Sequence, residues 1–124
     1  MDLNNKLKNI PHIYYFNLDN RTDRREYMET QFKKWGIENY TRISGTEFLA
    51  SKKDEWRHLI IDDKNYNLLV PIAANAISHL NFLKKWINNT DDEYLILMED
   101  DYDLNLIEYW HFDWNYLMSR LPLS

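Results

Sequence analysis

The chain has 124 residues, enough for one domain, and its 44% hydrophobic and 28% charged content is typical of a globular protein. Fifteen basic and twenty acidic side chains give a net charge of -5, which argues against a generally basic nucleic-acid-binding protein. The lack of cysteine excludes disulfides, thiolate catalysis and cysteine-bound zinc. With only Gly36 and Gly45, the chain has no glycine-rich loop that could hold a phosphate.

The sequence shows no sign of secretion or of membrane insertion. It contains no run of about 18 apolar residues, so no membrane span is expected. Met1–Asn9 is polar and mixed in charge, unlike a signal peptide. We therefore expect a cytoplasmic protein with a flexible leader over residues 1–10 and one domain over residues 11–124.

The first elements are a strand and a helix. Residues 12–16 form a short apolar run rich in β-forming side chains, which predicts a strand covered on both faces. A helix is expected next, with Asp23 as its N-cap and Glu26 as the capping-box partner. Gly36 is a suitable C-terminal stop for this helix. Its apolar stripe consists of Met28, Phe32 and Trp35.

The rest of the chain continues the alternation of strands and helices. This alternation predicts an α/β fold with a mostly parallel sheet flanked by helices. The remaining elements expected, in chain order, are a strand over 39–43, a helix over 46–57, a polar loop over 62–67, a helix over 72–87 with Pro71 in its first turn, a strand over 94–98 and a helix over 105–119.

Polar side chains follow two of the predicted strands. Open α/β sheets bind ligands beyond the carboxyl ends of their strands, and parallel strands bring these ends to one edge. The first cluster is Asn17, Asp19, Arg21 and Arg24, and the second is Glu99, Asp100, Asp101 and Asp103. The first cluster offers hydrogen bonds for a base or ribose and cations for phosphate, although it could also be an ordinary capped helix start.

The acidic cluster contains three consecutive carboxylates, Glu99–Asp101, in a protein that is already negative. Their mutual repulsion is most easily explained by a hard divalent cation, and oxygen ligands favour magnesium, manganese or calcium over zinc. The alternative is a solvated turn whose acids cap the next helix. An EF-hand is excluded because Leu106 and Phe112 stand where glycine and glutamate are needed.

Ser78 and His79 lie on the helix predicted over 72–87. A single histidine at the border of an apolar stripe is more often a packed, hydrogen-bonded residue than a ligand. Ser78 is expected to project toward the polar side of the helix, so a nucleophilic Ser–His pair is not expected.

Three motifs follow one another between residues 11 and 104. They are Asn17-Leu18-Asp19-Asn20-Arg21 with Arg24, then Ser78-His79-Leu80, then Glu99-Asp100-Asp101. Their order and spacing resemble glycosyltransferase family 25, which holds bacterial lipooligosaccharide galactosyltransferases and procollagen galactosyltransferases. Arg42-Ile43 also matches a segment of that family.

The resemblance implies a GT-A-like, Rossmann-like domain that binds a nucleotide sugar. Glu99, Asp100 and Asp101 would take the place of the motif that holds Mn²⁺ or Mg²⁺ and the diphosphate, with Asp101 as the direct metal ligand. Ser78 and His79 would support the donor site. The residues implied to line the nucleotide pocket are Asn17, Asp19, Arg21 and Arg24.

The implied activity is transfer of a hexose, galactose or glucose, from a UDP-sugar to a hydroxyl acceptor on a glycan or protein, as in lipopolysaccharide biosynthesis. Family members normally continue past the acidic motif, so the chain, which ends at Ser124, resembles the N-terminal portion of a domain truncated after that motif. We therefore expect self-association or a second chain that completes the sheet. Two alternatives stay open: a non-catalytic remnant that acts as a binding module, and a phosphohydrolase that uses Asp101 and Asp103.

Overall fold

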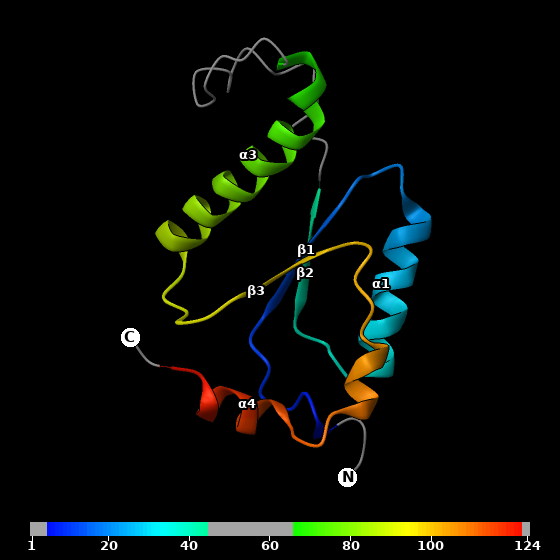
Figure 1. The fold of residues 1–124 in the computed structure, drawn as a ribbon, viewed down its shortest axis with the longest axis vertical. Helices are drawn as coiled ribbons and strands as arrows, with labels where there is room; N and C mark the ends of the chain where they lie inside the picture. The colour runs from blue at the N-terminus through cyan, green and yellow to red at the C-terminus, as the bar shows by residue number, and fades with distance from the viewer. Residues whose placement is uncertain (1–4, 45–65, 123–124) are drawn as a thin grey trace. The chain divides into compact units, whose positions relative to one another are not determined.

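The computed structural model describes residues 5–44 and 66–122, which belong to two compact units. The first unit combines Met1–Ile43 with Tyr94–Ser124, and the second is Ser44–Glu93. In chain order the elements are β1 (Ile13–Asn17), α1 (Thr22–Lys34), β2 (Tyr40–Ser44), α3 (Tyr66–Asn89), β3 (Ile96–Glu99), the 3₁₀ helix η5 (Asn105–Tyr109) and α4 (Trp114–Arg120) (Figure 1).

The three strands form one sheet in the order β2-β1-β3. β1 and β3 are parallel, with Ile13 opposite Ile96. β2 runs in the same direction, because the Ile13 N–H donates to the Asn39 carbonyl at 3.0 Å and Arg42, further along β2, reaches Asn17. The predicted α/β class with a parallel, Rossmann-like sheet is therefore confirmed.

The core lies between β1 and α1. The predicted two-sided burial of the first strand is confirmed, since four of the five residues of β1 are buried. The predicted stripe of α1 is confirmed as well, because Met28, Phe32 and Trp35 are at most 1% exposed. The rings of Tyr15 and Phe32 meet edge to face with centroids 5.5 Å apart. This packing fixes the strand whose end carries Asn17.

The predicted N-cap of α1 is wrong, whereas its predicted end is confirmed. The N-cap is Arg21, and Asp23 lies inside the first turn, where it accepts two hydrogen bonds from the Arg21 guanidinium. At the other end, Gly36 has φ of 69° and the Ile37 N–H donates to the Phe32 carbonyl at 2.8 Å. These features define a Schellman cap, in which glycine supplies the left-handed residue.

The second unit contains α3, which begins earlier than expected. Tyr66 and Asn67 are helical where the sequence predicts a polar loop, and Pro71 stands in the second turn rather than the first. The helix predicted over 46–57 lies outside the described residues. None of the helices in the described parts of the chain combines the length and the apolar character that crossing a membrane requires.

The prediction of a single last helix over 105–119 is wrong. Residues 105–109 form η5, Trp110 is extended, and α4 starts only after Asp113, whose side chain accepts from the Tyr116 N–H at 2.8 Å. Asp113 is thus an N-cap in the middle of the sequence that was expected to be one helix. The spacing of aromatic residues over 105–119 does not by itself reveal this internal helix start.

Part of the expected leader is buried. Leu7 joins the core at 5% exposure, and the buried Lys6 Nζ donates to the carbonyls of Ile107 and Glu108 at 3.2 and 2.6 Å. Lys6 therefore connects the start of the first unit to η5. The division at residue 10 between leader and domain stays a prediction.

Gly36→Ala tests the cap of α1. A Cβ atom is disfavoured at positive φ, so this variant is expected to lose about 1–2 kcal/mol of unfolding free energy. Lys33→Ala, at an exposed position of the same helix, is the control and is expected to change stability by less than about 0.5 kcal/mol. Urea unfolding of both variants checks this, and equal midpoints would contradict the assigned cap.

Tyr15→Phe tests the buried phenol. Burial of the hydroxyl, reinforced by the nearby Glu29 carboxylate, raises the pKa of Tyr15 to about 12. The fold favours the neutral phenol. The contribution of this group to the unfolding free energy is therefore fully present below the unfolded pKa of about 10 and is lost as the pH rises toward 12.

The Tyr15→Phe variant should therefore lose less stability than the wild type between about pH 10 and pH 12, the interval between the two pKa values. Thermal unfolding against pH measures this. Tyr109→Phe, at a tyrosine that is 72% exposed, is the control and should follow the wild-type curve. An unchanged alkaline curve for Tyr15→Phe would show that this phenol is not the group responsible.

Candidate active site

The carboxyl ends of β1 and β3 lie side by side at one edge of the sheet. The chain passes from β1 through α1 to β2 on one side of β1, and β3 lies on the other side, so the strand order reverses between β1 and β3. Ligands of open α/β sheets bind outside the strand ends at such a switch point. The prediction that both polar clusters share one edge is confirmed by the 2.9 Å contact between Asn17 and Asp100.

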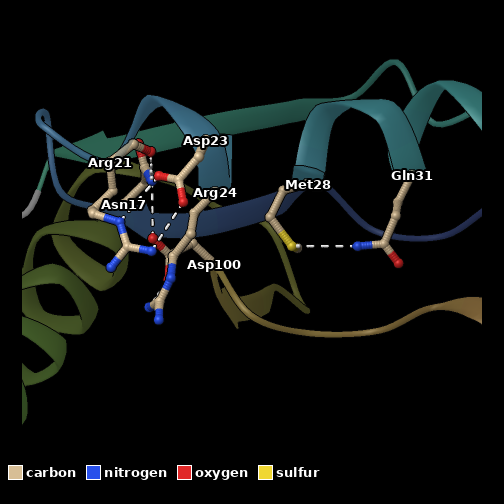
Figure 2. Close-up of polar contacts among 7 residues, drawn as sticks. All are labelled: Asn17, Arg21, Asp23, Arg24, Met28, Gln31 and Asp100. Atoms are coloured by element: carbon tan, nitrogen blue, oxygen red, sulfur yellow. Dashed lines mark hydrogen bonds and ion pairs between the residues drawn. The ribbon is translucent and has the colours of Figure 1, made fainter. Parts of the chain in front are cut away.

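Asn17, the last residue of β1, is the centre of the site and only 2% exposed. Its Nδ2 donates to the Arg21 carbonyl at 3.0 Å and to Asp100 Oδ2 at 2.9 Å. Its Oδ1 accepts from Arg42 Nε at 3.2 Å. Both amide hydrogens and the amide oxygen are therefore used. Figure 2 shows Asn17 between the first turn of α1 and Asp100.

Asp100 follows β3 directly and is 8% exposed. Oδ2 accepts from Asn17, and Oδ1 accepts from Arg24 Nη1 at 3.3 Å (Figure 2). A buried carboxylate needs such partners, because desolvation of an unpaired charge is costly. Its neighbour Asp101 is exposed. Two neighbouring acids of the motif therefore differ in their surroundings, because Asp100 is buried and Asp101 faces solvent.

Arg42 of β2 is a site residue to which the sequence analysis gave no role, although Arg42-Ile43 was among the segments that match the family. Its Nη2 donates to Asp19 Oδ1 and its Nε to Asn17, while its side chain is only 20% exposed. Asp19 itself is half exposed, at 50%. The available signal was a lone arginine within a short strand, in a segment that resembles the family.

Arg21 contributes its carbonyl to Asn17 and its guanidinium to Asp23. Arg21 donates two hydrogen bonds of 3.0 Å to the Asp23 carboxylate, and this partner lowers the Asp23 pKa to about 2. The expected cluster of the first motif is therefore divided in the structure. Arg24 joins Asp100, whereas the Arg21 guanidinium joins Asp23 on the surface.

A second buried amide holds the segment that follows the acids. Gln31 of α1 donates to the Tyr102 carbonyl at 2.9 Å and accepts from the Leu104 N–H at 2.7 Å. It also donates to the Met28 sulfur (Figure 2). The signal in the sequence was a glutamine next to the apolar stripe of a helix. Gln31 fixes the chain immediately after the acidic motif on the same helix that supplies Arg24.

The other predicted site residues are placed as follows. Ser78 is buried and His79 half-buried on α3, in the second unit, and their role at a donor site stays a prediction. Glu99 is half-buried at the end of β3. Among the side chains that the structure describes, in residues 5–44 and 76–122, no three Asp, Glu, His or Cys groups lie so that they could together hold a metal ion.

The acids at this edge offer carboxylate oxygens, the ligand type that hard cations prefer. The oxygens of Asp100 already accept from Asn17 and Arg24, whereas Asp101 presents an exposed carboxylate beside them in sequence. Mg²⁺ is commonly held by one or two carboxylates together with substrate phosphates and water. The assignment of Glu99, Asp100 and Asp101 as metal ligands stays a prediction.

A family model described as glycosyltransferase family 25 (LPS biosynthesis protein) matches residues 10–108. The chain belongs to glycosyltransferase family 25. The match spans β1 through most of η5, and therefore includes Asn17, Arg24, Arg42 and Asp100. No curated protein and no solved structure matches the chain significantly.

Asn17→Asp tests the central contact of this family 25 site. The variant replaces the NH₂ group that faces Asp100 with oxygen and brings two carboxylates together, so a loss of about 2 kcal/mol or more is expected. Asn115→Asp is the matched control, because the exposed Asn115 only accepts from Asn9 and an aspartate can still accept. Thermal unfolding at pH 7 compares them, and equal losses would contradict the assigned role of Asn17.

Proposed function

We propose that this chain is the nucleotide-sugar-binding part of a metal-dependent glycosyltransferase. The observation that carries the proposal is the Asn17–Asp100 contact, which joins the first and last family motifs at the switch point of the sheet. The donor would be a UDP-sugar, and the group transferred a hexose, galactose or glucose. The acceptor would be a hydroxyl on a glycan or protein, in keeping with a family described by lipopolysaccharide biosynthesis.

The chemistry of this edge suits a nucleoside diphosphate. Arg21 and Arg24 stand at the start of α1, where helix N–H groups favour bound anions. Their guanidiniums pair with Asp23 and Asp100, so a bound diphosphate would compete with these carboxylates for them. Asp19 is half exposed and offers a carboxylate that could accept from ribose hydroxyls. The domain would take the GT-A form, in which such an edge receives the nucleotide.

Asp101 is the residue proposed to hold Mn²⁺ or Mg²⁺. A divalent cation there would offset the charge that develops on the departing diphosphate. Asp100, held by Asn17 and Arg24, would keep the chain before Asp101 in a fixed position. A catalytic base is not assigned among the described residues.

The phosphohydrolase alternative has less support at Asp103. Its Oδ1 accepts from the Asn105 N–H at 2.8 Å, which is the role of a residue that stabilises a turn before η5. The binding-module alternative shares the donor site with the proposal, and a transfer assay distinguishes the two. Sugar transfer by this chain would exclude the non-catalytic remnant.

Titration calorimetry with UDP tests the proposed function. Wild-type protein is expected to bind UDP with Mn²⁺ present and more weakly without it. Asp101→Asn should weaken the Mn²⁺-dependent binding by about tenfold or more, which corresponds to about 1.4 kcal/mol. Glu38→Gln, which removes an exposed carboxylate before the start of β2, is the control and should bind as the wild type does. A folded wild-type chain that binds no UDP under either condition would overturn the proposal.

A further inference from the structure

Arg42 connects the edge strand to the centre of the site. It lies in β2, and its guanidinium reaches across to Asn17 at the end of β1 and to Asp19 in the following turn. Asn17 in turn donates to Asp100 after β3. The hydrogen bonds therefore run in one direction, from Arg42 through the Asn17 amide to the Asp100 carboxylate. They link β2 and β1 to the residue that follows β3.

The orientation of the Asn17 amide follows from the chemistry of its partners. An arginine Nε can only donate, so it must face the amide oxygen. The Asp100 carboxylate and the Arg21 carbonyl can only accept, so they must face the NH₂ group. A rotated amide would place NH₂ against the guanidinium and oxygen against the carboxylate. Among the residues that the structure describes, Arg42 is the donor to the amide oxygen of Asn17, and it therefore favours this orientation of the amide.

We propose that Arg42 is a positioning residue that acts on Asp100 through Asn17. A charged donor on the amide oxygen polarises the amide and strengthens the hydrogen bonds that its NH₂ group makes. The Asp100 carboxylate is thereby held in one place beside Asp101. The expected consequence for ligand binding depends on the proposed donor site, whereas the effect of Arg42 on Asn17 does not.

The first experiment reads the Asn17 amide directly by NMR of its side-chain NH₂ group. Arg42→Ala is expected to shift these resonances and to speed their exchange with water, because the polarising donor is lost. Arg42→Lys keeps the charge but lacks the planar fork, so it should restore the wild-type signals only in part. Arg25→Ala is the control, since Arg25 pairs with Glu29 on the exposed side of α1. Unchanged Asn17 signals in Arg42→Ala would overturn the inference.

The second experiment is a double-mutant cycle on Mn²⁺-dependent UDP binding. Arg42→Ala is expected to weaken binding about fivefold or more in the wild-type background and less than about twofold when Asn17 is already alanine. Equal effects in both backgrounds would show that Arg42 acts on the ligand without Asn17, and would overturn the inference.

Two controls keep these results separate from misfolding and from failure of the proposed function. Circular dichroism and thermal unfolding establish that each variant is folded, and Arg42→Lys replaces Arg42→Ala in both experiments if the alanine variant does not fold. If the wild-type chain binds no UDP, the proposed function fails while the NMR experiment still decides the role of Arg42.

Discussion

The hydrogen-bonding requirement of one buried amide organises the functional edge of this protein. Asn17 is 2% exposed, and a polar group so removed from water must find partners inside the fold or lose about 1–3 kcal/mol for each one missing. Its three partners come from β2, from the start of α1 and from the turn after β3. Satisfying one side chain therefore brings three distant segments of the sequence to a common point.

The core makes this arrangement possible. β1 is packed on both faces, so its end has little freedom, and α1 is fixed against it by Met28, Phe32 and Trp35. The same helix contacts the acidic segment at two places. Arg24, in its first turn, donates to Asp100, and Gln31, near its end, donates to the Tyr102 carbonyl. A rigid strand and helix thus carry the polar residues of an edge that is otherwise made of turns, as the precise placement of a binding site requires.

Features set by local periodicity and by sheet geometry could be predicted from the sequence. The apolar run of β1, the stripe of α1 and the stop at Gly36 depend on neighbours within a few residues. The meeting of the two polar clusters followed from parallel strands alone. Arg42 could not be assigned in this way, because its partners are 23 and 25 residues away and the choice depends on which strand lies beside β1. Asp23 was misplaced for a different, local reason, since the guanidinium of Arg21, two residues earlier, binds its carboxylate.

The structure changes the argument for a cation at the acidic motif. The sequence alone indicates that three adjacent carboxylates repel one another and that each needs a compensating positive charge. In the fold, Asp100 turns inward and finds that charge in Arg24 and a neutral donor in Asn17, so protein groups already account for it. The case for a divalent ion is thereby concentrated on Asp101, the exposed acid of the motif. An ion held there would take its remaining ligands from water and from a bound diphosphate, so metal binding and donor binding should depend on each other.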